Sequence, residues 1–462
     1  MTYSEAIKKL RRKMIITQTE LAQLLNVSYG TVNRWESGKY EPTIKIKRKL
    51  HVLFDKYDIN MEDWSMPKKD MTEAKINKEN EFYTQLSDIE QELKHYKDQF
   101  KDKVVFCNCD DPYESNFFKY FAINFNYLGL KKLIATCYDG SPFVGTQLSL
   151  FDFMDNDTIN DKKTAYKIEI TEVEDFNNDG TIDLFDVDKL LKNNKNVLTK
   201  LIGNGDFRSD ECIELLRESD VVVTNPPFTL FREFINLLNL YNKKFLIIGN
   251  TNALSYQEVF RMFKADKIRT GYTNFNVGMY FIVPDSTEKY HKIVDGKKLV
   301  RVATSCWFTN LPVSIHNEKL TLYKNYNEKE YPRYDNYDAI NVDKYTDIPC
   351  DYFDLMGVPI TFLDKYNPEQ FEIVSMAKTP LGNDYRTKIY PQQTQHKVGE
   401  TKTQLVSKLN DGPAIKVDSI PEKGIYYKIG DEIFVSKYAR LLIKRRDVKL
   451  WRLNSMKYQL EK

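Results

Sequence analysis

The sequence predicts an α/β protein with an all-α segment at its N-terminus and a basic region at its C-terminus. Three observations predict this fold class. Apolar stretches of strand length alternate with helical stretches through the middle of the 462-residue chain, which is typical of a mostly parallel sheet. Residues 1–55 show only helical spacing of apolar side chains. Hydrophobic residues make up 42% of the chain, which is enough to bury the cores of more than one domain.

Charge is distributed unevenly along the chain. The net charge of +2 conceals +6 in residues 1–55 and +7 in residues 401–462, so the middle carries −11. An acidic body with basic ends predicts that both ends meet a polyanion, although scattered solvated lysines would give the same counts.

Other features of composition narrow the class of protein. No apolar run is long enough to cross a bilayer, and the first residues lack the apolar stretch of a signal peptide. We therefore expect a cytoplasmic protein that does not enter a membrane. The six cysteines form no Cys-x-x-Cys pair, so reduced structural thiols are expected and no metal site is predicted.

The basic N-terminal segment predicts a series of short helices. Apolar residues recur at helical spacing over 5–14. Thr17 and Glu20 can form a capping box for a second helix over 18–25. After a tight turn, Ser28 can cap a third helix. Two helices joined by such a turn are the helix-turn-helix arrangement.

The residues of this segment resemble the phage-repressor-type helix-turn-helix family. The similarity is carried by Gln18, Leu21-Ala22, Asn26-Val27-Ser28, Val32, Trp35-Glu36, Gly38 and Pro42. The family usually has glycine where Asn26 stands, but asparagine also tolerates a left-handed turn. In that family the third helix lies in the major groove, which implies DNA contacts by Gln18 (near a phosphate), Ser28, Tyr29, Thr31, Asn33 and Arg34. A helical bundle used for protein contacts is the alternative.

The middle of the chain contains four candidate strands, Val104–Asn108, Leu133–Tyr138, Val221–Thr224 and Phe245–Gly249. Ligands of parallel α/β sheets bind beyond the carboxyl ends of the strands. The residues that directly follow each strand are therefore the first candidates for a functional site.

The third of these strands ends in Asn225-Pro226-Pro227-Phe228. The side-chain carbonyl of Asn225 and the backbone carbonyl of Pro226 can each accept one hydrogen of a nucleobase amino group, which favours a tetrahedral nitrogen with a free lone pair. Pro226 and Pro227 fix φ and make the carbonyl geometry rigid. Phe228 offers a face on which an extruded base can stack. An ordinary strand-to-loop turn is the alternative.

Longer strings of residues resemble the EcoRI-type adenine-specific DNA methyltransferase family. They are Val105–Pro112, Ser115–Phe117, Thr304–Asn310, Gly357–Phe362 and Asn367–Glu372, and together they span roughly residues 80–375. The resemblance implies a Rossmann-like methyltransferase core that uses S-adenosylmethionine. It also implies that the methyl group goes to the N6 amino group of an adenine flipped out of double-stranded DNA, and that a cognate restriction endonuclease, if there is one, is a separate chain.

The same resemblance implies which residues hold the cofactor. Phe82, Tyr83 and Thr84 lie where amino-methyltransferases hold its methionine end, and Asp206 is placed to bond its adenine amino group. Asp110 and Asp139 follow the first and second strands and are the candidates for further contacts, with Asp139 at the ribose. Surface turns would explain each of these segments as well. The Gly-x-Gly turn that usually follows the first strand is missing here.

The C-terminal residues combine basic and aromatic side chains. Arg440, Lys444, Arg445 and Arg446 suit a target-recognition region that contacts phosphates and groove edges. A solvated basic face on a small β-rich subdomain is the alternative. The expected domains are a helix-turn-helix domain (1–58), a linker (59–78), a methyltransferase catalytic domain (79–375) and the basic target-recognition region (376–462).

Residues 175–186 are similar to a calcium-binding loop, with oxygen-bearing side chains at the ligand positions and Gly180 at the sixth. The last position is Asp186, which reaches less far than the usual glutamate. Residues 166–170 predict a strand where such loops have an entering helix, and a β-hairpin turning at 178–180 explains the segment as well.

Three other functions remain open from the sequence. Methylation of cytosine N4 uses a similar site. Methylation of a protein glutamine also uses Asn-Pro-Pro-aromatic, but the helix-turn-helix and the basic ends argue against it. A DNA-binding transcriptional regulator with a catalytically inactive methyltransferase fold is disfavoured by the intact sequence from Asn225 to Phe228.

Overall fold

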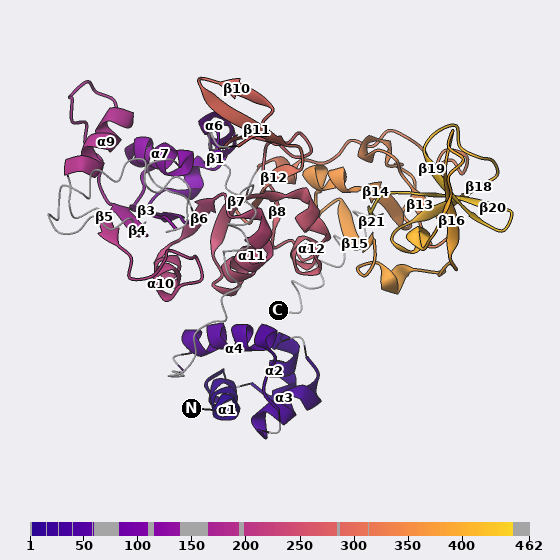
Figure 1. Ribbon diagram of the computed structural model, residues 1–462, viewed down its shortest axis with the longest axis horizontal. Coiled ribbons are helices and arrows are strands. Elements are labelled where there is room, and N and C mark those ends of the chain that lie inside the picture. Colours follow the sequence, from indigo (N-terminus) through magenta and orange to yellow (C-terminus); the bar gives the residue numbers. More distant parts are fainter. Residues whose placement is uncertain are drawn as a thin grey trace, which may run out of the picture. The chain divides into compact units, whose positions relative to one another are not determined.

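The computed structural model (Figure 1) describes residues 2–446 with several gaps. Residues 1, 15, 26, 39, 58, 60–82, 110–114, 139–164, 194–197, 284–286, 313 and 447–462 lie outside the described residues. Four residues named from the sequence, Asn26, Phe82, Asp110 and Asp139, are among them. The chain divides into two compact units, Met1–Lys78 and Glu79–Lys462, which we describe separately.

The first unit consists of helices α1 (Tyr3–Met14), α2 (Gln18–Leu25), α3 (Tyr29–Glu36) and α4 (Ile44–Lys56). Thr17 and Glu20 form the expected capping box, because the Thr17 amide donates to Glu20 Oε2 at 2.7 Å and the Glu20 amide donates to Thr17 Oγ1 at 3.2 Å. Ser28 caps α3 by accepting from the Thr31 amide. The four helices bury a common apolar core that includes Leu10, Leu21, Val32, Trp35, Leu50 and Phe54. The expected helix-turn-helix arrangement is therefore present.

An eight-stranded sheet forms the centre of the second unit, in the order β5-β4-β3-β2-β6-β7-β12-β8. Its strands are β2 (Val104–Cys107), β3 (Lys132–Thr136), β4 (Tyr166–Ile170), β5 (Leu198–Lys200), β6 (Val221–Thr224), β7 (Lys244–Asn250), β8 (Arg269–Thr270) and β12 (Ser305–Thr309). Strands β3, β2, β6 and β7 pair in parallel, and the outer pairs are antiparallel. The four strands expected from the sequence are the four parallel ones.

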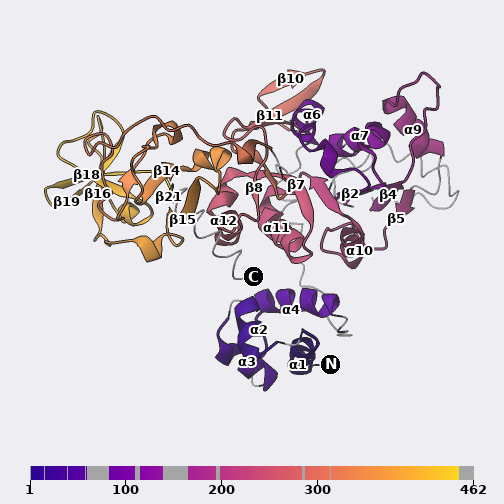
Figure 2. The same ribbon diagram turned by 180° about the vertical axis from the view of Figure 1, so that it is seen from behind.

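Helices cover both faces of this sheet. They are α6 (Leu86–Leu93), α7 (Asn116–Ile123), α8 (Phe125–Leu128), α9 (Leu184–Asn193), α10 (Asp210–Glu218), α11 (Phe231–Leu240) and α12 (Gln257–Lys264). Buried residues of α6, α7 and α9 share one apolar core with residues of β2, β3, β6 and β7 that point to the same face. Figures 1 and 2 show α10, α11 and α12 on the opposite side of the sheet. Apolar strands buried on both faces are what a parallel sheet requires.

A small antiparallel sheet lies beside the central one, in the order β1-β9-β11-β10. It contains β1 (Tyr83–Thr84), β9 (Met279–Val283), β10 (Lys292–Val294) and β11 (Lys297–Val302). The first strand comes from the beginning of the second unit and the other three come from a much later segment. The pairing of β1 with β9 therefore brings distant parts of the sequence together.

Two further sheets follow towards the C-terminus. One contains β13 (Ile340–Asn341), β14 (Met356–Pro359), β21 (Arg440–Arg445) and β15 (Phe371–Ala377), and the other contains β17 (Gln404–Val406), β16 (Gln393–Lys397), β19 (Ile425–Ile429), β20 (Glu432–Ser436) and β18 (Ala414–Val417). The domain boundary expected at residue 376 falls inside β15. Since β21 pairs with both β14 and β15, the segments on either side of that boundary share one sheet.

Short 3-10 helices lie at η1 (Lys97–Gln99), η3 (Phe228–Leu230), η4 (Thr251–Ser255), η5 (Ser314–Asn317), η6 (Tyr345–Asp347), η7 (Ile360–Lys365), η8 (Asn383–Tyr385) and η9 (Lys408–Asn410). Within the described part of the chain, no helix has the length and apolar character needed to span a bilayer.

The segment that is similar to a calcium loop leads from β4 through a loop into α9. The β-hairpin considered as an alternative at 178–180 is absent, because residues 171–183, all of them described, form no strand. The carboxylate of Asp186 is buried and accepts the amides of Phe176 and Asp183 at 2.8 and 2.9 Å, and Asp175 accepts the amides of Asp179 and Gly180. Both carboxylates therefore accept hydrogen bonds from backbone amides of the loop itself. Among the described residues, no three or more His, Cys, Asp and Glu side chains are grouped to hold a metal ion.

Candidate active site

Asn225-Pro226-Pro227-Phe228 lies at the carboxyl edge of the central sheet. Strand β6 pairs in parallel with β2 on one side and β7 on the other, and the motif directly follows it. The Thr224 hydroxyl donates to the backbone carbonyl of Asn108, which joins the end of β6 to the end of β2. Pro226 is buried, whereas Asn225 and Phe228 are partly exposed. The motif therefore occupies the ligand-binding edge of the sheet, where the side chains of Asn225 and Phe228 are partly accessible and the Asn225 Oδ1 atom itself is buried.

The small sheet connects this motif to one of the predicted cofactor segments. The ring of Phe228 meets the ring of Phe281 on β9 edge to face, with centroids 6.2 Å apart. Phe281 is fully buried and is the register partner of Thr84 on β1. Asn116, at the start of α7, donates to the backbone carbonyl of Thr84 at 2.7 Å. The fold thus brings Tyr83 and Thr84 close to the Asn-Pro-Pro-Phe motif.

Several buried polar atoms near this edge have no hydrogen-bond partner among the described residues. They include Oγ1 of Thr136 at the end of β3 as well as Oγ1 of Thr84 and Oδ1 of Asn108, and all three residues are almost completely buried. Leaving such an atom unpaired costs about 1–3 kcal/mol, so native structures normally satisfy it. A ligand that carries N–H or O–H donors would satisfy the Thr84 and Asn108 oxygens.

Asp206 lies in a tight loop against the end of β3. Gly205 has φ +76°, and a side chain there would collide with the carbonyl oxygen of Cys137. The Asp206 carboxylate is buried and pairs with Arg208, with Nη2–Oδ2 at 2.6 Å and Nε–Oδ1 at 2.9 Å. Arg208 also reaches Glu233 at 3.0 Å. Both oxygens of Asp206 already accept hydrogen bonds from this arginine, which sequence reasoning did not include.

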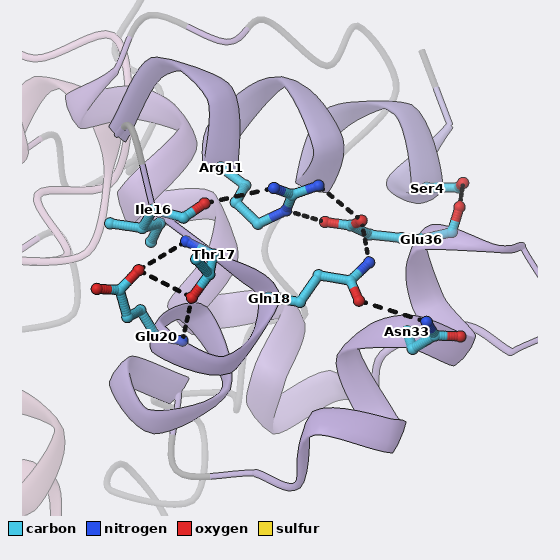
Figure 3. Close-up of polar contacts among 8 residues, drawn as sticks. All are labelled: Ser4, Arg11, Ile16, Thr17, Gln18, Glu20, Asn33 and Glu36. Atoms are coloured by element: carbon cyan, nitrogen blue, oxygen red, sulfur yellow. Dashed lines mark hydrogen bonds and ion pairs between the residues drawn. The ribbon is translucent and has the colours of Figure 1, made fainter.

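In the first unit, Gln18 at the start of α2 bonds to two residues of the third helix (Figure 3). Its Nε2 donates to Glu36 Oε2 at 2.6 Å, and its Oε1 accepts from Asn33 Nδ2 at 3.3 Å. Glu36 is buried and also accepts from Arg11 Nε at 2.8 Å. Burial alone would raise the pKa of Glu36, but the hydrogen bonds from Arg11 and Gln18 hold that pKa below its ordinary value. Gln18, expected near a phosphate, therefore also orients a residue of α3.

The face of α3 opposite the core presents the residues expected to contact DNA. Val32 and Trp35 are buried, whereas Ser28, Tyr29, Asn33 and Arg34 are exposed and Thr31 is half-buried. Helical periodicity produces this division, because residues three and four apart share a face. The exposure of these side chains is consistent with the DNA contacts expected from the sequence, and those contacts remain a prediction.

The four basic residues expected to contact DNA near the C-terminus have different environments. Arg440 is buried on β21 and pairs with Asp343 at 3.4 Å, which does not fit a direct phosphate contact. Arg445 donates to the backbone carbonyl of Cys350, and Arg446 donates to that of Phe371 at 3.2 Å. Lys444 is exposed. The arginines hold neighbouring segments to β21, and the lysine remains accessible to a partner.

Comparison with known families identifies the group to which this site belongs. A family model described as adenine-specific methyltransferase EcoRI matches residues 70–446, and a helix-turn-helix model matches residues 7–57. The chain belongs to the EcoRI family of adenine-specific methyltransferases. In this EcoRI-family methyltransferase, the match to the enzyme family covers the central sheet, the small sheet and both C-terminal sheets.

Individual relatives give the same result. This EcoRI-family methyltransferase is 46% identical over 314 residues to the Type II methyltransferase M.EcoRI of Escherichia coli, covering 66% of this chain and 88% of the relative. It is 38% identical over 384 residues to the Type II methyltransferase M.MgeORF184P of Mycoplasma genitalium, covering 81% of this chain and 98% of the relative. It is also 38% identical over 322 residues to the Type II methyltransferase M.MpnI of Mycoplasma pneumoniae, covering 68% of this chain and 86% of the relative. No solved structure matches the chain.

Sequence reasoning missed several residues of this site. Phe281 stands in the alternating apolar run Met279-x-Phe281-x-Val283, which indicates a strand but not its neighbour. Arg208 follows Asp206 by two residues, and that spacing was available as a weak signal. The unpaired oxygen of Asn108 could not be found from the sequence, because it depends on how β2 and β6 end side by side.

Proposed function

We propose that this methyltransferase transfers a methyl group from S-adenosylmethionine to the N6 amino group of an adenine flipped out of duplex DNA. One observation carries the proposal: Asn225–Phe228 stands at the carboxyl end of β6, and Phe281 links it to the Tyr83–Thr84 segment. The family description and the relatives' names as Type II methyltransferases support it.

We further propose that the second unit has a Rossmann-like methyltransferase core. Four parallel strands with helices on both faces support this, and so does a site placed where β2, β3 and β6 end. The duplex would also meet the helix-turn-helix unit and the basic C-terminal region, where Lys444 is exposed. A cytoplasmic location beside a cognate restriction endonuclease is part of the same proposal.

The residues at the carboxyl edge fit the cofactor. S-adenosylmethionine supplies an electrophilic methyl group, and it carries an ammonium group and ribose hydroxyls that can donate hydrogen bonds. The unpaired oxygens of Thr84 and Asn108 are acceptors of the kind those donors need. Tyr83 and Asp206 complete the proposed cofactor set among the described residues, together with Phe82, Asp110 and Asp139, which lie outside them.

The protein's own residues prepare the amino group for attack. Asn225 Oδ1 accepts one amino hydrogen and the backbone carbonyl of Pro226 accepts the other, so that the nitrogen lone pair is directed at the methyl carbon. S-adenosylmethionine bound beside the motif would supply the methyl group from its sulfonium sulfur, and the surplus proton of the amino group would pass to water. Phe228 stacks on the base, and the Phe281 ring packs at nearly a right angle against the Phe228 ring.

Sequencing that detects modified bases tests this function in cells that express wild type, Asn225→Ala or Asn236→Ala. Asn236 is an exposed asparagine on α11, so its replacement is a matched control. We expect one modified adenine motif with wild type and the control. Loss of one acceptor at Asn225 should lower kcat roughly a hundred- to a thousand-fold.

Calorimetry should show that Asn225→Ala still binds S-adenosylmethionine, because the replaced oxygen serves the base. Modified cytosine in place of adenine would refute the proposed substrate. Undiminished methylation by Asn225→Ala would refute the proposed mechanism, and cofactor binding without labelling of mixed-sequence duplex would favour an inactive regulator.

A further inference from the structure

The β10–β11 hairpin projects from the small sheet and has no role in the site described above. Strands β10 (Lys292–Val294) and β11 (Lys297–Val302) pair antiparallel and are joined by Asp295 and Gly296, whose φ values are +49° and +75°. Positive φ at both central residues is typical of a type I′ turn, which makes a well-defined two-stranded ribbon. All three residues of β10 are exposed. Figures 1 and 2 show the ribbon at the outer edge of the second unit.

The ribbon is basic although it belongs to the acidic part of the chain. Residues 287–302 hold five Lys and Arg and two Asp and Glu, while the whole middle of the chain carries −11. Exposed apolar side chains lie among the cations, with Tyr290, Ile293 and Val294 each at least 41% exposed. A basic ribbon within the acidic middle of the chain indicates that a polyanionic partner binds at the ribbon.

The register places three of the cations on one face. Lys292 is opposite Leu299, Lys297 is opposite Val294, and Arg301 is opposite Tyr280 of β9. Since directly paired residues share a face and side chains alternate along a strand, Lys292, Lys297, Arg301 and Tyr280 project to the same side. The position of Lys292 Nζ, 4.2 Å from the centre of the Tyr280 ring, agrees with this.

The spacing of these cations suits a nucleic-acid backbone. Lys297 and Arg301 are four residues apart, which is about 13 Å along a strand. Duplex DNA carries one negative charge per about 1.7 Å of its axis, so such a face can meet several phosphates. Arg301 donates one N–H to the Val277 carbonyl at 2.9 Å, and its guanidinium has further donors for a phosphate.

The ribbon is built on the strand that supports the base-stacking residue. Val300 of β11 is the register partner of Phe281, whose ring packs against Phe228. Lys297 is three residues from Val300, which is about 10 Å along the ribbon. When a base is flipped onto Phe228, the duplex it has left must lie just outside the site. Because Lys297 and Arg301 alternate with Val300 along β11, the cations project to the face of the small sheet opposite Phe281, and they would meet the duplex on that outer side.

We propose that the β10–β11 ribbon is a DNA-binding element that holds phosphates of the bound duplex, on the outer face of the small sheet, through Lys292, Lys297 and Arg301. This inference rests on the proposed function, and it adds an element that is separate from the helix-turn-helix unit and from the basic C-terminal strand. Contacts to phosphates would position the duplex without reading its sequence.

The salt dependence of DNA binding tests the proposal in the full chain. The variant Lys292→Gln/Lys297→Gln/Arg301→Gln is compared with the matched control Lys101→Gln/Lys103→Gln/Lys131→Gln, whose exposed lysines precede β2 and β3 at the opposite edge of the sheet. The probe is a fluorescent duplex that contains the adenine motif found by sequencing. Loss of three phosphate contacts should reduce the slope of log K against log salt by about 2.7.

The change in slope has a direct experimental consequence. Between about 50 mM and about 200 mM salt, wild type should lose about 40-fold more affinity than the ribbon variant, and the control should behave as wild type. The KM for DNA should rise in the ribbon variant while kcat at saturating DNA stays unchanged, since Asn225–Phe228 is intact. A purely structural role would not produce this separation.

Two further measurements keep the test decisive. Calorimetry with S-adenosylmethionine shows whether the triple ribbon variant is folded. If the triple variant does not fold, the single variant Lys297→Glu replaces it, because Lys297 is an exposed residue beside the turn. A wild-type salt slope and KM in the folded triple variant, or a wild-type KM in Lys297→Glu, would overturn the ribbon proposal. That result would leave the proposed function standing, because Asn225→Ala tests it separately.

Discussion

Replacing Arg11 with methionine should strongly destabilise the helix-turn-helix unit. Arg11 Nε lies 2.8 Å from Glu36 Oε1 and its Nη2 lies 3.3 Å from Glu36 Oε2. The Glu36 side chain is only 5% exposed, whereas Arg11 is 27% exposed. In the variant, the buried Glu36 carboxylate would keep the hydrogen bond from Gln18 but lose the positive charge of the Arg11 guanidinium that compensates it. Removing one partner of a buried pair costs about 3–5 kcal/mol, and the partial exposure of Arg11 places this case near about 3 kcal/mol.

That loss is large compared with the stability of so small a unit. At the usual stability per residue, a helical unit of this size unfolds with about 3–8 kcal/mol. Hydrogen exchange of α1 and α3 peptides in the full chain should therefore show much faster exchange for Arg11→Met. Arg12→Met is the matched control, because Arg12 is exposed on the same helix and should change stability by less than about 0.5 kcal/mol.

The double variant Arg11→Met/Glu36→Leu separates the ion pair from simple loss of packing. Removing both charges leaves no uncompensated carboxylate, so it should recover most of the lost protection. Unchanged exchange in Arg11→Met would refute the reasoning, and so would a double variant that is no more stable than the single one.

Two further predictions concern pH and the loop of Asp206. Burial lowers the pKa of His51 to about 4, against about 6.5 when unfolded, so protonation favours the unfolded state. The stabilisation is complete above about pH 6.5 and is lost as the pH falls towards about 4, by up to about 3 kcal/mol. The protection factors of α4 amides, which correct for the intrinsic pH dependence of exchange, should fall on acidification less in His51→Gln than in wild type, and an equal fall in both would contradict this. Gly205→Val should weaken S-adenosylmethionine binding at least about ten-fold in calorimetry, because a side chain would collide with the Cys137 carbonyl and φ is positive. Gly399→Val, with positive φ but open space around it, should bind normally, and equal affinities in the two variants would exclude the collision as the cause.

Local patterns predicted much of the fold. The capping box at Thr17, the cap at Ser28 and the four parallel strands were all visible in short stretches of sequence. Such features depend on the backbone preferences and apolar spacing of neighbouring residues. At Asn178-Asp179-Gly180 the chain does turn, but within a loop, because these residues favour a turn in a loop as readily as in a hairpin.

By itself, the sequence determined the chemistry available to this protein: a strand ending in Asn225–Phe228, a helix-turn-helix segment and an acidic body with basic ends. Only the tertiary structure decided which distant residues meet. It paired Thr84 with Phe281 and set Phe281 against Phe228, it buried Arg440 beside Asp343, and it projected the basic ribbon from the strand behind the site. The physical reason is that contacts between distant segments depend on how strands pair and faces pack, and short-range sequence preferences carry no information about which segments those are.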